Sequence, residues 1–185
     1  MKSLTQFIKE SQEIHESLFG DIVRKLLDTG LSWIGGSVKW IADKSADAVG
    51  EVWKTHKDTF GTVYSDFRRT HPQYNFLPEM PNNPNDYALL DISILYNKGV
   101  TAEHKIDYAT NLINSFKTGN HKSKSDSFYI AFVTASCYVG IVKNKKVTSA
   151  DKAKADNFVN KVKSSVDDNT KNLIDSNIHS YMSKI

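Results

Sequence analysis

The sequence contains little that could cross-link the chain or carry it through a membrane. Cys137 is the one cysteine among 185 residues, which excludes an intramolecular disulfide framework and a cysteine-rich zinc site. The longest uncharged apolar stretch, 127–142, is shorter than the roughly 20 residues that a membrane-spanning helix needs. The N-terminal segment carries Lys9, Glu10 and Glu13 in place of the apolar run of a secretory signal. We therefore expect a soluble protein, located inside a cell or inside a particle.

The chain also has a small net charge and lacks the common catalytic motifs. The net charge of +3 is too small to indicate a dedicated nucleic-acid-binding protein. No serine elbow, glycine-rich phosphate loop or His-Glu-x-x-His pair occurs. None of the histidines lies four residues from another; they are His15, His56, His71, His104, His121 and His179. We expect no catalytic residue, no metal site and no cofactor, and hence a protein that is not an enzyme.

Proline is confined to one segment. All four prolines, together with four asparagines, fall within residues 71–85. Because proline blocks helix continuation and biases the preceding residue to extended conformations, this segment is predicted to be an irregular connection. It divides the chain into an amphipathic helical N-terminal part, 1–70, and a helical domain, 86–185. The predicted fold class is all-α, a helical bundle with an extended amphipathic helical N-terminal part.

Helical spacing and capping residues organise the C-terminal part. A helix is predicted over 87–96, and Thr101 is placed to cap a second one. The apolar stretch 128–142 has the spacing of a buried helix, but its β-branched and aromatic residues leave strands as the alternative. Thr148 with Asp151 resembles a cap, and Asp167 or Asp168 is predicted to cap the last helix.

Two similar polar turns lie 47 residues apart in this part. They are Asn97-Lys98-Gly99-Val100-Thr101 and Asn144-Lys145-Lys146-Val147-Thr148. In each, the valine is expected to turn back to the core and the threonine to cap the next helix. A duplicated helical hairpin would explain the pair, and chance is the alternative. The helix pairs of 86–185 loosely resemble the tellurite-resistance-B-like helical domain. The acidic turn residues of that family are lacking here, so no metal site is transferred.

Positive charge is concentrated between Lys117 and Lys154, with eight lysines against two aspartates. No arginine, the usual reader of bases, lies in this region, which argues against sequence-specific binding of nucleic acid. The alternatives are a solubilising role and non-specific contact with a polyanion such as nucleic acid. The candidate contact residues are Lys117, Lys122, Lys124, Lys143, Lys145 and Lys146.

The N-terminal peptide is the most suggestive motif of the chain. Leu4, Phe7 and Ile8 form a small apolar stripe that could dock in a groove. With Met1-Lys2, Phe7-Ile8 and Glu10 before a small residue, the peptide resembles the capsid-targeting peptide of internal head proteins of large tailed phages. That resemblance implies cleavage after the glutamate of an Ile/Leu-x-Glu site. Two such sites occur, Ile8-Lys9-Glu10 before Ser11 and Ile14-His15-Glu16 before Ser17.

The resemblance implies a non-enzymatic virion protein, a structural or head-packaged component of a large tailed bacteriophage that works through protein–protein interaction. The alternative is a soluble helical interaction module, a regulator or inhibitor that binds a host protein outside the virion. The expected partners are other virion or host proteins, and the expected location is the virion or the host cytoplasm. The balanced charge on the tryptophan-containing segment 33–54 is a poor match to anionic lipid, so a membrane partner is not expected. The sequence leaves the oligomeric state open.

Overall fold

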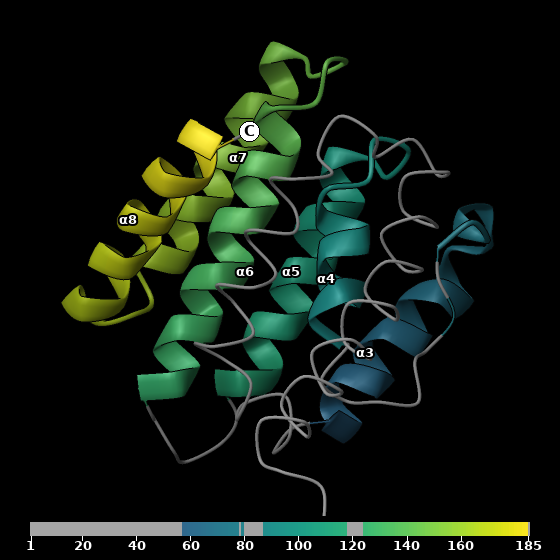
Figure 1. Ribbon diagram of the computed structural model, residues 1–185, viewed down its shortest axis with the longest axis horizontal. Coiled ribbons are helices and arrows are strands. Elements are labelled where there is room, and N and C mark those ends of the chain that lie inside the picture. Colours follow the sequence, from purple (N-terminus) through teal and green to yellow (C-terminus); the bar gives the residue numbers. More distant parts are fainter. Residues whose placement is uncertain (1–56, 78, 80–86, 118–123, 185) are drawn as a thin grey trace, which may run out of the picture.

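The computed structural model describes residues 57–77, 79, 87–117 and 124–184, and every element in these ranges is helical. The elements are α3 (Lys57–Thr70), the short 3-10 helix η2 (Pro72–Tyr74), α4 (Tyr87–Leu95), α5 (Ala102–Lys117), α6 (Lys124–Val142), α7 (Ser149–Lys163) and α8 (Asp168–Lys184). The helices form one bundle, with α6 between α8 on one side and α4 and α5 on the other (Figure 1). The all-α prediction is confirmed for this part of the chain. The helices predicted within 1–56 lie outside the described residues.

Helix α6 is the central element. Its structure answers whether 128–142 forms a helix or strands, which the sequence left open. The stretch 128–142 is helical, not a pair of strands. All residues of 129–137 are buried, and α6 contacts α4, α5, α7 and α8. A helix surrounded in this way is apolar on all sides and therefore shows little periodicity. Its β-branched and aromatic residues serve packing here.

Helix α3 and the segment after it belong to the same core. Phe60, Tyr64 and Phe67 of α3 are buried, as are Tyr74 and Leu77. The Phe60 ring lies 5.3 Å from that of Phe116 and 5.0 Å from that of Tyr129, between centroids. The core therefore draws side chains from both sides of residue 86. The predicted division into 1–70, 71–85 and 86–185 stays a prediction.

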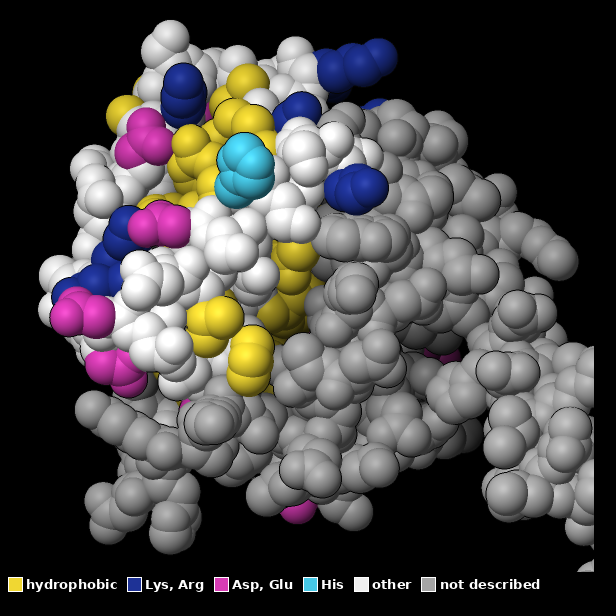
Figure 2. Space-filling view, turned by 60° about the vertical axis from the view of Figure 1, so that its left-hand side comes forward, with side chains coloured by type: hydrophobic (Ala, Val, Ile, Leu, Met, Phe, Trp, Pro, Cys, Tyr) yellow, Lys and Arg dark blue, Asp and Glu magenta, His cyan; other side chains and the backbone are white. Residues whose placement is uncertain are grey.

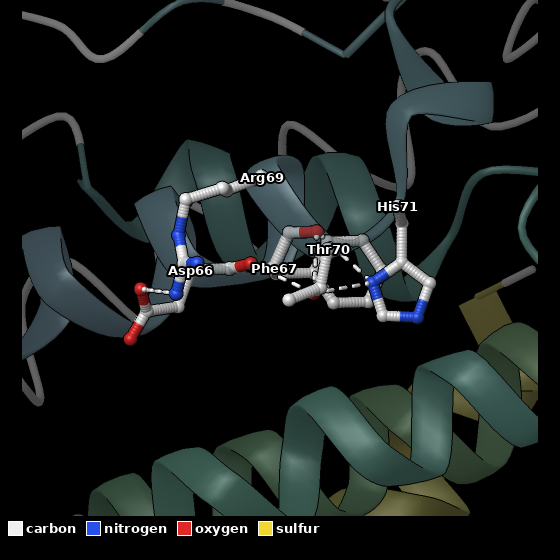
Figure 3. Close-up of polar contacts among 5 residues, drawn as sticks. All are labelled: Asp66, Phe67, Arg69, Thr70 and His71. Carbon is white, nitrogen blue, oxygen red and sulfur yellow. Dashed lines mark hydrogen bonds and ion pairs between the residues drawn. The ribbon is translucent and has the colours of Figure 1, made fainter.

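The end of α3 follows from the proline after it. Pro72 cannot continue a helix, and the last carbonyls are satisfied locally. The Phe67 carbonyl accepts hydrogen bonds from the His71 backbone N–H (3.0 Å) and from His71 Nδ1 (2.9 Å), as Figure 3 shows for the side chain. A carbonyl only accepts, so Nδ1 carries the proton. The Arg69–Asp66 ion pair beside it (2.9 Å; Figure 3) is exposed and contributes little stability.

The predicted caps of the last two helices are confirmed. Thr148 and Asp151 form a capping box at the start of α7. Asp167 Oδ1 accepts from the Thr170 backbone N–H (2.8 Å) and precedes α8, so Asp167 rather than Asp168 is the cap. Among the described residues, no helix has the length and apolar character that crossing a membrane requires.

Candidate functional site

The two similar turns adopt the same local structure. Asn97 Oδ1 accepts a hydrogen bond from the Gly99 backbone N–H (2.8 Å). Asn144 Oδ1 accepts in the same way from the Lys146 backbone N–H (3.1 Å). Each asparagine thus forms an Asx turn with the residue two positions on, which is the reason asparagine suits this position.

The expected roles of the valine and threonine are confirmed in both turns. Thr101 Oγ1 accepts from the His104 backbone N–H (3.2 Å), and Thr148 Oγ1 accepts from that of Asp151 (3.1 Å). Val100 is 2% exposed, and Val147 packs, partly buried, against the same core. Whether the hairpins arose by duplication stays a prediction, but their turns are equivalent position by position.

The two turns lie against one another and border a half-open cavity. Asn144 Nδ2 donates to the Lys98 carbonyl oxygen, a long contact of 3.4 Å between the turns. Between them is a cavity of about 250 Å³, lined by both turns and by residues at the starts of α5 and α7. The charged residues of the lining are three lysines and one carboxylate: Lys98, Lys105, Lys146 and Asp151. The cavity is therefore predominantly cationic.

Lys105 is the unusual member of this lining. It lies on the first turns of α5, and only 1% of its surface is exposed. Its Nζ donates to the Gly140 carbonyl oxygen of α6 (2.8 Å), the single hydrogen bond found for this ammonium among the described residues. Burial lowers the pKa of Lys105 to about 8, because an apolar surrounding disfavours the charged form.

Gly140 makes this contact geometrically feasible. A Cβ at this position would lie 2.0 Å from the Leu95 carbonyl oxygen and 2.8 Å from the Leu95 carbonyl carbon. The end of α4 and the last turn of α6 thus approach so closely that no side chain fits between them. This close approach places the Gly140 carbonyl within reach of Lys105.

The six lysines proposed for polyanion contact are not one cluster in the described structure. Lys117 and Lys124 lie at the end of α5 and the start of α6, and Lys122 falls outside the described residues. Lys146 lines the cavity, whereas Lys143 and Lys145 are not part of its lining. On the face seen in Figure 2, acidic and basic side chains alternate around hydrophobic ones, so this face is not uniformly basic.

Sequence reasoning missed two residues of the cavity, Lys98 and Lys105. Lys105 lies four residues before Ala109, in register with the buried face formed by Ala109, Leu112 and Ile113. A lysine in register with an apolar stripe was the available signal, since such a charge is buried and requires a partner.

A cluster of aromatic and imidazole rings lies beside the first turn. The Thr101 backbone N–H donates to the Tyr74 hydroxyl (3.3 Å), and that hydroxyl lies 2.6 Å from His104 Nδ1. The Tyr74 hydroxyl thus links the start of α5, at Thr101, to the His104 ring. The His71 ring lies 4.3 Å from that of His104, between centroids. In the described ranges, no group of three or more histidine, cysteine or acidic residues is placed to hold a metal ion.

Two further sets of titratable groups in the core, a buried thiol and a carboxylate with two phenols, are closed off from solvent. Cys137 is fully buried, which raises the pKa of its thiol to about 12 and leaves it protonated. Asp91, 1% exposed, accepts from the Tyr108 hydroxyl (2.6 Å) and the Tyr129 hydroxyl (3.1 Å). Burial, and next the charge of Asp91, raise the pKa of both phenols well above the usual value, so they remain donors. This network joins α4, α5 and α6.

The processing and docking candidates of the N-terminal peptide lie outside the described residues. They are Leu4, Phe7, Ile8, Glu10, Ser11, Ile14, Glu16 and Ser17. Comparisons of the chain with protein-family models, with curated proteins and with solved structures found no match.

Proposed function

We propose that the protein is a non-enzymatic, virion-associated protein of a large tailed bacteriophage, packaged in the head and acting through protein–protein contacts. The observation that carries this proposal is the opening peptide, Met1–Ser11, with its apolar stripe and its Ile-x-Glu site before a small residue. In this proposal, residues 1–16 deliver the chain to the assembling head, and the helical bundle is what they deliver.

The chemistry of the described residues is consistent with a protein that binds rather than catalyses. Cys137 is a buried thiol, and His71 and His104 are each tied through Nδ1 to a neighbouring group. A catalytic nucleophile instead needs access to substrate and an adjacent base. The tyrosine phenols around Asp91 serve as hydrogen-bond donors within the core.

The test is the intact mass and the N-terminal residue of the protein recovered from purified particles and from lysate. A chain in particles that begins at Ser11 or Ser17 supports delivery followed by processing. A full-length chain in particles supports a virion component that is not cleaved. A chain found only in lysate overturns the virion role and favours the alternative, a soluble regulator or inhibitor of a host protein.

A pair of variants tests the docking stripe itself. Phe7→Asp places a charge in the stripe, and Gln6→Asp places the same charge on the opposite side of the predicted helix. Delivery through the stripe requires that Phe7→Asp abolish incorporation into particles and that Gln6→Asp leave it intact. Equal incorporation of the two variants would remove the targeting role.

A further inference from the structure

Three lysines of the second turn have no acidic partner in the part of the chain that the structure describes. Lys143, Lys145 and Lys146 follow the end of α6, and the side chains of Lys145 and Lys146 are exposed. The ion pairs found in the described ranges involve other cations. These three lysines therefore present positive charge to solvent.

The acidic side chains at the starts of the two helices that follow the turns are engaged elsewhere. Glu103 of α5 pairs with Lys154 (3.4 Å). Asp151 of α7 accepts hydrogen bonds from the Thr148 backbone N–H (3.1 Å) and hydroxyl (2.7 Å) within the capping box. Neither carboxylate is paired with a lysine of the second turn in the described structure, so the turn keeps its positive charge.

An exposed aromatic ring lies beside the two turns. Phe76 is 38% exposed, and a Cβ added to Gly99 of the first turn would lie 3.2 Å from Phe76 Cζ. The edge of this ring therefore lies directly against the first turn. The first turn also contacts the second, where Asn144 Nδ2 donates to the Lys98 carbonyl oxygen (3.4 Å). The fold thus brings Phe76 and the lysines of the second turn to the same end of the bundle, although they are distant in sequence.

Packing against a buried neighbour holds the Phe76 ring in place. The centroids of the Phe76 and Tyr74 rings are 5.8 Å apart, and the two rings meet edge to face at 70°. Tyr74 is 5% exposed, and its hydroxyl accepts from the Thr101 backbone N–H (3.3 Å) and lies 2.6 Å from His104 Nδ1. A surface ring that is already held in this way loses little freedom when a ligand stacks on it.

We propose that this end of the bundle binds single-stranded nucleic acid, with Phe76 stacking on a base and Lys143, Lys145 and Lys146 contacting phosphates. These four residues form the turn patch. A single strand offers both groups at once, a charged backbone and the flat face of an unpaired base. The turn patch contains no arginine, the usual reader of bases, so the binding tolerates different sequences. The proposal goes beyond the virion role and does not depend on it.

Other anionic partners fit the turn patch less well. A duplex would meet the lysines, but its paired and stacked bases offer no free face to Phe76. Helices that bind an anionic membrane surface do so through an apolar face of several large side chains. The other exposed large hydrophobic side chain of the described residues is Phe128, near the start of α6. In Figure 1 the start of α6 is at the lower end of the bundle, and both turns are at the upper end.

The stacking contact is tested by binding of the full-length protein to a dye-labelled oligothymidine of about 12 nucleotides, followed by fluorescence anisotropy. Phe76→Ala should weaken binding by about tenfold or more, the effect of losing one stacked base. Phe76→Trp keeps a stacking face and should bind within a factor of about three of the wild type. Phe128→Ala removes the other exposed ring and should leave the affinity unchanged. Binding of Phe76→Ala at wild-type affinity would overturn the proposal.

The salt dependence of the same binding tests the lysines. Lys145→Ala/Lys146→Ala should reduce the slope of log affinity against log salt concentration by about 1.4, roughly 0.7 for each lost phosphate contact with a single strand. Lys161→Ala/Lys171→Ala removes the same charge from the last turn of α7 and from α8, and should leave the slope unchanged. Equal reductions in the two double variants would indicate general attraction to a cationic protein and would overturn the turn patch.

Two further ligands distinguish the class of partner. A duplex of the same length should bind more weakly than the single strand, and with the same affinity for the wild type and Phe76→Ala. Vesicles that contain phosphatidylserine should not carry the protein upward in a flotation gradient. A duplex that binds as tightly as the single strand, or flotation that Phe76→Ala abolishes, would overturn the proposal in favour of a duplex or a membrane.

Discussion

Gly140 and Lys105 lie where α4, α5 and α6 meet, and both positions tolerate little substitution. Gly140 permits contact between the backbones of α4 and α6, and its carbonyl then accepts from Lys105. The glycine and the lysine therefore depend on one another. Gly140 does not stand out in the sequence, because a glycine in a helix usually signals a break, whereas Lys105 is marked only by its register with the apolar face of α5.

Gly140→Ala should destabilise the protein strongly. The new Cβ would collide with the Leu95 carbonyl, and backbone on both sides prevents an easy shift. We expect the free energy of unfolding to fall by about 1–3 kcal/mol or more, the usual cost of overpacking. Urea unfolding followed by circular dichroism measures it. Gly99→Ala is the control: its Cβ would meet Asn97 Oδ1 and Phe76 Cζ at 3.2 Å, side-chain atoms that can move, so its loss should be smaller. Equal losses would contradict the close approach.

Lys105 should make stability depend on pH in the alkaline range. Its pKa is lowered from 10.5 to about 8 in the folded chain, so between these values the unfolded chain binds a proton that the folded chain does not. Stability therefore rises as pH increases from 8 to 10.5, by about 3 kcal/mol at most. Cys137 opposes this above pH 9, because its raised pKa means that the unfolded thiol ionises first.

The comparison with Lys105→Met isolates the lysine from Cys137 and the other ionisable groups. The remaining charged groups of the cavity, Lys98, Lys146 and Asp151, are common to both proteins. The unfolding free energy of the wild type minus that of the variant, measured by urea unfolding at several pH values, should rise between pH 8 and 10.5. If this difference does not change between pH 8 and 10.5, folding does not lower the pKa of Lys105.

At the scale of single elements, the turns and caps were predicted outright, and the central helix was predicted with strands as the alternative. Asparagine, valine and threonine act locally in each turn, so their order in the sequence suffices to predict their roles. Residues 129–137 of α6 are all buried, so polar residues do not mark a solvent face there and the spacing alone did not exclude strands. The cavity depends on the two turns meeting in space, which spacing along one chain does not reveal.

Thr148→Ala should cost about 1 kcal/mol of stability through the loss of the α7 cap. The threonine hydroxyl accepts from the Asp151 N–H and donates to the Asp151 carboxylate, and both interactions vanish with it. Thermal or urea unfolding of the full chain measures the loss. Ser149→Ala, one residue further on, is the matched control and should change stability by only a few tenths of a kcal/mol. If Ser149→Ala loses more stability than Thr148→Ala, Thr148 is not the residue that caps α7.

At the scale of the whole molecule, the question is whether α3 belongs to the folding unit of α4–α8. The proline-rich segment predicted a boundary near residue 86, yet Phe60 packs against Phe116 of α5 and Tyr129 of α6, and Tyr64 is buried in the same core. Short connections with several prolines usually separate elements, but they do not prevent the flanking helices from packing together. The core composition favours one cooperative unit from α3 to α8.

Phe60→Ala tests this unity. Removing a buried phenylalanine typically costs about 3–5 kcal/mol through lost contacts and the cavity left behind. If α3 and α6 unfold together, native-state hydrogen exchange of the full chain should show amide protection reduced by the same free energy in both helices. Val63→Ala, on the partly exposed side of α3, should produce a smaller and equally shared loss. If protection falls in α3 alone while α6 and α8 keep theirs, α3 is an appended element, and the boundary near residue 86 is also the boundary of the folding unit.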